Sequence, residues 1–191
     1  MKYNIRKANL SDVKAIAKVH IAVWKTTYQS IIPQDFLDNL STKRSENNWR
    51  KTINNKDFIN FIIEDENSKI VGFISGGANR EKELLPEYDG ELMAIYIFKE
   101  YQQKGLGSKL FTTFKQELLK RNFTNMVIWV LRDNNSKYFY EKMGGQFLKE
   151  KEYHIGSGNQ IGVTYGWKNI KSKEKKCLII KKENKNGKFQ N

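Results

Sequence analysis

The chain has little of what metal centres, disulfide frameworks and membrane spans require. Its 191 residues include one cysteine, Cys177, which excludes an intramolecular disulfide, and only two histidines, which lie far apart. These residues form no metal-ligand cluster, so we expect no metal. No apolar stretch approaches the length of a membrane span, and the N-terminus lacks the plan of a signal peptide. These absences predict a cytoplasmic protein that has no membrane partner.

The chain has enough length and an ordinary apolar fraction, 39%, for one domain with a sizeable core. Its net charge of +13 is uneven, because residues 169–191 contain eight lysines and two glutamates. We therefore expect a folded domain over residues 1–168 and a basic, partly disordered tail over 169–191. Within the tail, Cys177–Ile180 has the pattern of a short edge strand. A nucleic-acid contact is the alternative for the tail, disfavoured because Phe189 is its one aromatic residue.

The most informative segment runs from residue 90 to residue 107. An apolar run, Leu92–Phe98, is typical of a buried strand, a turn with two glycines follows, and a helical apolar pattern then begins at Leu110. A strand, a glycine turn and a helix start together create an anion site, because backbone N–H groups and the helix dipole point at one place. Gly105 and Gly107 let the backbone come close to a phosphate group.

This turn differs from the two common phosphate-binding motifs. In a Walker loop a lysine follows the glycines, whereas Lys104 precedes them. A dinucleotide fingerprint needs a third glycine, and Leu110 stands there instead. The turn therefore predicts a different phosphate ligand.

A second block follows along the chain. Met126–Leu131 is another strand-like apolar run, and Arg132–Ser136 offers helix N-caps. A short helix over Lys137–Met143 would then end at Gly144 and Gly145, which act as a helix stop.

The spacing Gln102-x-x-Gly105-x-Gly107, followed by this second block, resembles the GNAT superfamily of N-acetyltransferases. The resemblance covers Tyr3–Trp167. It implies a mixed α/β GNAT fold, with a central, mostly antiparallel twisted sheet of about seven strands and helices on both faces. It also implies transfer of an acetyl group from acetyl-CoA to a primary amine in a ternary complex. Two alternatives stay open: a non-enzymatic acyl-CoA-binding module on the same fold, and a basic nucleic-acid-binding protein.

The resemblance assigns most of the site. The loop would hold the diphosphate of coenzyme A, and the backbone of the central strand would pair with the pantetheine arm as an added strand does. The implied cofactor-binding residues are Ile95, Tyr96, Ile97, Gln102, Gln103, Lys104, Gly105, Leu106, Gly107, Ser108 and Asn134.

Two residues are candidates for acid–base catalysis. Tyr140 matches the tyrosine that the family places beside the cofactor's sulfur as general acid. Glu91, at the start of the central strand, stands where family members with a basic glutamate carry it, counted back from Gln102. The alternatives are a packing aromatic for Tyr140 and a solvent-facing carboxylate for Glu91.

The acceptor is a small-molecule or peptide amine on this interpretation. Trp24 and Tyr28 share a helical face and are candidates for the acceptor-site wall, with core packing as the alternative. The acidic residues Glu81, Glu83, Glu87, Asp89 and Glu91 cluster in the loop before the central strand. Acids near a cleft attract cations, which favours a small cationic amine, although a solvated loop is the simpler interpretation. The sequence leaves a homodimer open.

The remaining segments complete the expected order of elements. We expect a strand over Tyr3–Lys7, a helix capped by Ser11 that carries a half-buried His20, and a helical region over Pro33–Ile53. Two hairpins are expected. Their strands are Phe58–Glu64 with Ile70–Gly76, and Gln146–Ile155 with Gln160–Trp167.

Overall fold

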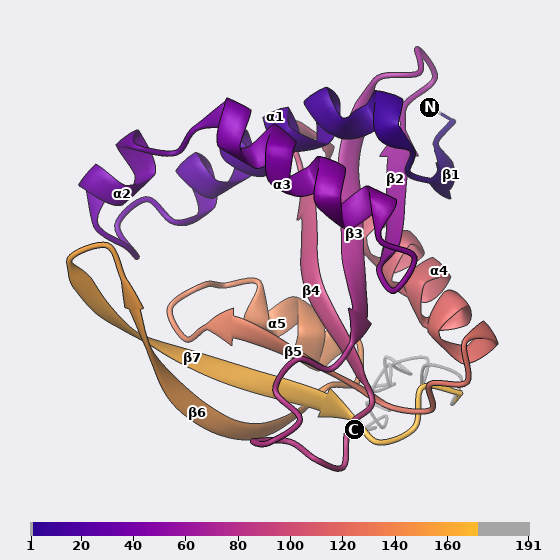
Figure 1. Cartoon of the computed structure of the whole chain (residues 1–191), viewed down its shortest axis with the longest axis vertical. Helices are drawn as coiled ribbons and strands as arrows, with labels where there is room; N and C mark the ends of the chain where they lie inside the picture. The colour runs from indigo at the N-terminus through magenta and orange to yellow at the C-terminus, as the bar shows by residue number, and fades with distance from the viewer. Residues whose placement is uncertain (1, 172–191) are drawn as a thin grey trace, which may run out of the picture.

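Within residues 2–171, which the computed structural model describes, seven strands form one sheet (Figure 1). Their order is β1-β2-β3-β4-β5-β7-β6, and each neighbouring pair is antiparallel except β4 and β5. The expected mixed α/β fold and both hairpins are confirmed. The strands are β1 (Asn4–Lys7), β2 (Ile59–Glu64), β3 (Ile70–Ala78), β4 (Gly90–Ile97), β5 (Met126–Leu131), β6 (Gln146–Ile155) and β7 (Gly158–Trp167).

Helices cover both faces of the sheet. One face, the near side in Figure 1, carries α1 and α3, and α4 packs on the other face against β2, β3 and β4. The short α5 shares a hydrophobic cluster with α4. The helices are α1 (Val13–Thr27), α2 (Gln34–Asp38), α3 (Thr42–Asn54), α4 (Leu106–Lys120) and α5 (Lys137–Lys142), with 3-10 turns η1 (Leu10–Asp12) and η2 (Lys99–Tyr101).

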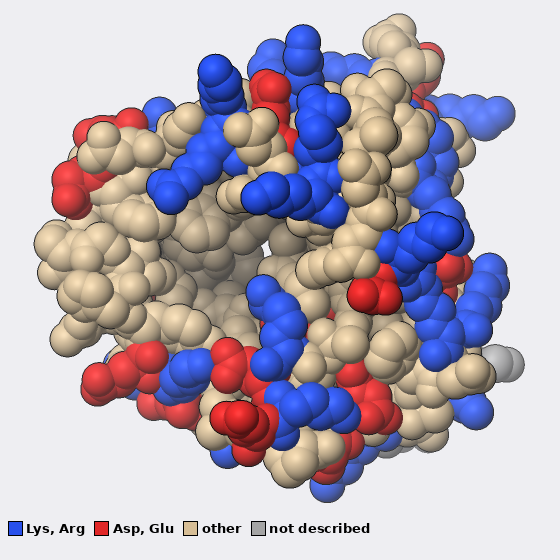
Figure 2. Space-filling view, viewed as in Figure 1, with Lys and Arg blue, Asp and Glu red and all other residues tan. Residues whose placement is uncertain are grey.

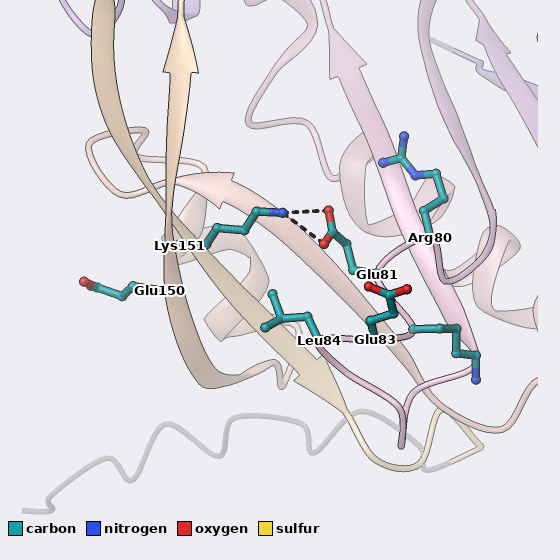
Figure 3. Close-up of a pocket in the computed structure, with 7 residues that line it drawn as sticks. Arg80, Glu81, Glu83, Leu84, Glu150 and Lys151 are labelled. Atoms are coloured by element: carbon teal, nitrogen blue, oxygen red, sulfur yellow. Dashed lines mark hydrogen bonds and ion pairs between the residues drawn. The ribbon is translucent and has the colours of Figure 1, made fainter.

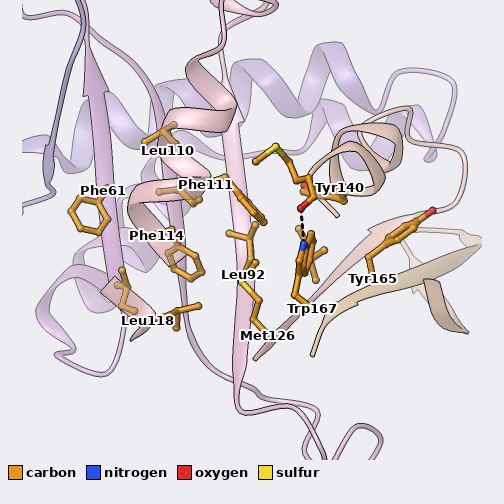
Figure 4. Packing of buried hydrophobic residues seen from close by; sticks show 14 of the residues in the cluster. Phe61, Leu92, Leu110, Phe111, Phe114, Leu118, Met126, Tyr140, Tyr165 and Trp167 are labelled. Carbon is orange, nitrogen blue, oxygen red and sulfur yellow. Dashed lines mark hydrogen bonds between the residues drawn. The ribbon is translucent and has the colours of Figure 1, made fainter. Parts of the chain in front are cut away.

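The larger core lies between α4 and the sheet. Leu110, Phe111 and Phe114 are fully buried there, as the apolar spacing of this helix predicts (Figure 4). Trp167 of β7 packs against Phe111, and its indole N–H donates a hydrogen bond to the Met143 carbonyl at 2.8 Å. This bond ties the end of α5 to the sheet, so the two blocks of the motif rest on one rigid core.

Two local expectations were wrong. Ser11 does not cap the first helix. Asn9 caps the preceding 3-10 turn η1, where its side chain accepts a hydrogen bond from the Ser11 N–H and Asp12 accepts one from the Asn9 N–H. The helix α1 then follows from Asp12, which makes no side-chain cap bond. The single helical region over Pro33–Ile53 is two helices, because the Ser41 hydroxyl accepts from a backbone N–H and starts α3 anew.

The feature that positions the site is the separation of β4 from β5. The two strands pair only at Gly90 with Met126 and at Glu91 with Val127. Beyond Glu91 the edge of β4 that faces β5 has no ladder partner among the described residues. A β-bulge lies just past this point, since Ser75 pairs with Ala94 and Gly76 with Leu92.

The described chain stays packed up to Ile170. This residue is 3% exposed, belongs to the main core, and donates its backbone N–H to the Thr124 carbonyl at 2.9 Å. The predicted tail from residue 172 onward, with the expected strand at Cys177–Ile180, lies outside the described residues. Among the described helices, none has both the length and the apolar character needed to cross a membrane.

Candidate active site

A cleft of about 690 Å³ opens where β4 and β5 separate. Its walls come from the second half of β4, the glycine loop, the start of α4, the segment after β5, α5, and the end of α1 with the turn after it. The cleft thus brings together two blocks that are distant in sequence. Ten of the predicted site residues line it: Ile95, Ile97, Gln102, Gln103, Gly105, Leu106, Gly107, Ser108, Asn134 and Tyr140.

The glycine loop presents backbone donors to this cleft. Gly105 caps α4 in the left-handed region, with φ 74°, a conformation that favours glycine. The first backbone hydrogen bond of α4 runs from the Lys109 N–H to the Gly105 carbonyl. The N–H groups of Leu106, Gly107 and Ser108 therefore come before the first intrahelical bond. These N–H groups, at the positive end of the helix dipole, form a cradle for an anion.

The predicted cation of the loop is turned away from the cleft. The Lys104 ammonium lies over the Tyr101 ring, 5.1 Å from its centroid, and Lys104 is not among the lining residues. Lys142, which the sequence reasoning did not select, lines the cleft at the end of α5. A lysine at this position can attract a phosphate as one in the loop would, because a lysine acts on phosphate as a point charge.

The second block places Tyr140 in the cleft. Tyr140 is 5% exposed, and burial raises the pKa of its phenol, so the hydroxyl keeps its proton at neutral pH. The Asn134 side chain accepts from the Ser136 N–H at 2.9 Å, which shapes the start of α5. The helix stop is confirmed, since Gly144, with φ 86°, and Gly145 donate their N–H groups to carbonyls of α5.

Tyr96 is not among the residues that line the cleft. Its ring stacks on His20, with centroids 5.4 Å apart and planes 17° apart. His20 is satisfied as expected, because its Nδ1 accepts from the Trp49 indole N–H at 3.2 Å. Burial lowers the pKa of His20 to about 4, which keeps the ring neutral.

The two candidates for the acceptor wall stay a prediction, and the cleft lining contains their neighbours. Trp24 and Tyr28 pack against each other, with centroids 4.8 Å apart, and neither lines the cleft. Thr27 and Ile31, which the sequence reasoning missed, do line it. Tyr28 still approaches the site, because burial raises the pKa of its phenol while the neighbouring Tyr96 and Asn134 side chains lower it. The helical face that the sequence indicated was therefore close, but the lining residues lie beside it.

Glu91 is buried and paired, not solvent-facing. It is 1% exposed, lies outside the cleft lining, and accepts hydrogen bonds from Arg80. Two other acids of the loop are also paired: Glu81 with Lys151 at 2.9 Å and Asp89 with Lys82 at 2.8 Å. The negative charge of the loop is therefore largely offset. In Figure 2, Lys and Arg side chains gather above the central hollow, and acidic and basic side chains are mixed below it.

Further lining residues come from the segment after β5 and from α5. They were not singled out from the sequence, because the polar ones suggest only a loop and a helix start, and the aromatic one suggests core packing. These residues are Asp133, Asn135, Ser136 and Phe139. In the part of the chain that the structure describes, no group of three or more His, Cys, Asp or Glu side chains could hold a metal ion.

Comparison with known proteins decides the family. Residues 24–145 match the Acetyltransferase (GNAT) family. The chain belongs to the GNAT family of acyltransferases. The uncharacterized N-acetyltransferase YuaI of Bacillus subtilis strain 168 is 37% identical over 87% of this chain and 93% of its own length. A spermidine N(1)-acetyltransferase of Thermoplasma acidophilum is 25% identical over 80% of this chain and 99% of its own length.

Solved structures share the GNAT fold. The PaiA N-acetyltransferase of Thermoplasma acidophilum, solved in complex with coenzyme A, superposes with a TM-score of 0.66 at 20% identity. The matched region covers 87% of this chain and all of that chain. An N-acetyltransferase of Staphylococcus aureus Mu50 gives a TM-score of 0.68 at 15% identity, over 89% of this chain and 99% of its own. At these identities the likeness concerns the fold.

Proposed function

We propose that this GNAT enzyme transfers an acetyl group from acetyl-CoA to a primary amine, by direct attack within a ternary complex. The observation that carries the proposal is the single cleft that joins the glycine loop, the free edge of β4 and Tyr140. A cleft of this size suits an extended cofactor arm. The neighbour solved with coenzyme A has the same fold, which supports the choice of cofactor.

The described residues fit acetyl-CoA along its length. The N–H groups of Leu106, Gly107 and Ser108 would hold the diphosphate, with Lys142 as a neighbouring cation. The unpaired edge of β4 would hydrogen-bond the pantetheine arm as an added strand. Bound there, the cofactor supplies an activated acyl group. Most of the rate enhancement would then come from holding the two reactants at near-attack distance, an effect worth up to roughly 7–11 kcal/mol.

The chemical step needs two proton transfers. The acceptor ammonium must first lose a proton, since alkyl amines titrate near pH 10 as lysine does, and Glu91 is the proposed acceptor of that proton, directly or through one water. The amine nitrogen then bonds to the acetyl carbon while the carbon–sulfur bond breaks. Tyr140 gives its proton to the departing sulfur, and a free N–H of β4 can stabilise the developing oxyanion.

The acceptor in this proposal is a small cationic amine. Trp24 and Tyr28 belong to the same apolar cluster as Ile31, which lines the cleft, and aromatic rings near a site favour cations over anions. The relative named as a spermidine acetyltransferase supports the same class. The acidic loop contributes less than its composition suggests, because three of its acids are paired.

A panel of amines assayed with acetyl-CoA tests this proposal. The panel would contain polyamines, amino acids, aminoglycosides and short peptides, and the readout is thiol release together with the mass of the acetylated product. We expect one cationic small amine to exceed the others by at least tenfold in kcat/KM. A preference for peptides would contradict a small-amine acceptor and indicate a peptide acceptor. Acetyl-CoA binding without transfer to any amine would support the non-enzymatic acyl-CoA-binding module.

A further inference from the structure

The helices α1 and α3 present a basic surface on one side of the molecule. Together they contain seven lysine and arginine residues and one carboxylate, Glu46, which leaves a net charge of +6. Figure 2 shows Lys and Arg side chains gathered where Figure 1 places these two helices. The seven residues, all exposed, define the basic surface: Lys14, Lys18, Lys25, Lys43, Arg44, Arg50 and Lys51.

The cations of the basic surface lack acidic partners. Within residues 2–171, no carboxylate forms an ion pair with any of the seven side chains. Cations elsewhere in the fold are paired. Lys7 contacts Glu117 at 2.8 Å, and Lys151 contacts Glu81 at 2.9 Å in a separate surface groove of about 660 Å³ (Figure 3). Like charges one helical turn apart repel each other, so an anionic partner would stabilise this surface.

The spacing of the cations makes the surface long and continuous. Lys14, Lys18 and Lys25 fall within about 40° of one another around α1 and span about 16 Å of its length. On α3 the cations form two pairs, and the members of each pair are seven residues, or about two turns, apart. The two helices pack against each other, which places their axes about 8–10 Å apart. Such an area suits an extended polyanion better than one small anion.

The rest of the surface is polar, which separates the classes of partner. The other exposed side chains of the two helices are Thr26, Thr42, Asn47, Asn48 and Asn54. The exposed large apolar residues of the described chain are Leu10, Tyr138 and Phe147, and none of them belongs to α1 or α3. A protein interface has an apolar core, and a helix that lies in a membrane needs an exposed apolar face. Threonine and asparagine, in contrast, commonly hydrogen-bond phosphate oxygens of nucleic acids.

The aromatic residues of the two helices favour a duplex over a single strand. Proteins that bind single strands stack the bases on aromatic side chains. Trp49 is 8% exposed and packs in the core, and Trp24 is half-buried. A duplex needs no stacking platform, and about 16 Å of its axis carries about nine phosphates, enough for seven cations.

We propose that the basic surface of α1 and α3 binds the phosphate backbone of a nucleic-acid duplex without reading its base sequence. The partner is thus recognised by its regular negative charge, and counterion release drives the association. This binding goes beyond acetyl transfer, because none of the seven cations lines the cleft.

The experiment measures fluorescence anisotropy of labelled duplexes of about 20 base pairs, titrated with the full chain from about 50 to 200 mM salt. Duplex DNA and duplex RNA are separate arms, each with two unrelated sequences. The basic-surface variant combines Lys14→Gln, Lys18→Gln, Arg44→Gln and Lys51→Gln. The matched control removes four exposed lysines that lie elsewhere, with Lys2→Gln, Lys99→Gln, Lys109→Gln and Lys168→Gln. Both variants lose four charges and retain residues 172–191.

We expect the wild type to bind at least one kind of duplex with little sequence preference and with a steep salt dependence. The basic-surface variant should bind at least about tenfold more weakly at low salt, whereas the control should stay within about threefold of wild type. The slope of log K against log salt should fall by roughly 3–4 in the basic-surface variant, because each lost phosphate contact removes about 0.9. Glutamine suits helices about as well as lysine does, and circular dichroism verifies the fold. If the fourfold variant does not fold, Lys14→Gln/Lys18→Gln should give half the change in slope.

Equal losses in the two variants would show that net charge alone drives binding, and would overturn the proposal. Undiminished binding in the basic-surface variant would overturn it as well and would indicate residues outside this surface. Phosphatidylglycerol vesicles and polyglutamate complete the test. Stronger binding to either of them than to both duplexes would indicate a membrane or an acidic protein instead. Acetylation of the best amine, measured in parallel, reports separately on the proposed function.

Discussion

The side-chain amide of Gln102 donates a hydrogen bond to the carbonyl oxygen of Ile97 at 2.9 Å. The bond joins the glycine loop to the last residue of β4, across the η2 turn. It fixes the donors that would hold the cofactor's phosphates relative to the strand edge that would pair with its arm. Gln102 therefore contributes more through the loop it orients than through its own place in the cleft lining.

Replacing Gln102 with alanine should weaken acetyl-CoA binding. A hydrogen bond of this kind contributes about 0.5–1.5 kcal/mol, which corresponds to roughly a two- to tenfold rise in Kd. Gln116→Ala, an exposed glutamine on the outer side of α4, is the matched control and should bind as the wild type does. Calorimetric titration of both variants is the measurement, and equal affinities would show that the bond does not orient the loop.

Replacing Tyr140 with phenylalanine should slow acetyl transfer and leave acetyl-CoA affinity nearly intact. Only a proton donor to the departing sulfur is lost, and such donors contribute up to about 10²–10⁴-fold. Single-turnover rates are the appropriate readout, because slow product release would hide the effect in the steady state. Tyr138→Phe on the same helix is the control, since that side chain is 59% exposed. A wild-type single-turnover rate in Tyr140→Phe would show that Tyr140 is not the general acid.

His20 should make the fold less stable in mild acid. Burial lowers the pKa of folded His20 to about 4 from 6.5, so the unfolded chain takes up the proton first as the pH falls. The free energy of unfolding therefore keeps the full contribution of His20 above about pH 6.5. It falls progressively as the pH drops to about 4, by at most ~3 kcal/mol.

Urea unfolding across this pH range measures whether the unfolding free energy falls with pH because of His20. His20→Gln should flatten the decline of the unfolding free energy relative to the wild type, because glutamine does not titrate. His154→Gln removes the other histidine, which is exposed, and should leave the decline as it is. Parallel curves for all three proteins would mean that His20 is protonated as easily in the folded state as in the unfolded chain.

Local chemistry predicted the parts of the site that are continuous in sequence. Gly105 and Gly107 follow a strand and open a helix, and the residues around Asn134 and Tyr140 repeat that pattern. Each unit depends on turn conformation and apolar spacing within a short window, which a sequence displays directly. The cleft that joins the two units follows once both strands belong to one sheet.

The long-range pairings could not be predicted in the same way. Arg80 and Glu91 meet because the chain between β3 and β4 folds back, and the bulge that follows Glu91 decides which face each later side chain takes. Composition alone therefore suggested an open acidic loop, where the structure has ion pairs. Likewise, the sequence shows that Trp24 and Tyr28 share a helical face. Which residues of that helix line the cleft depends on how the helix packs against the sheet, and the structure has Thr27 there.

The central claim is that the glycine loop binds acetyl-CoA, and calorimetry on a Gly105→Val/Gly107→Val variant tests it most directly. Valine at position 105 opposes the left-handed conformation there, and at position 107 it adds a side chain whose Cβ lies 3.4 Å from the Phe139 ring, beside the proposed phosphates. We predict binding at least tenfold weaker than wild type, about 1.4 kcal/mol, with circular dichroism verifying the fold. Unchanged affinity in a folded double variant would contradict the account.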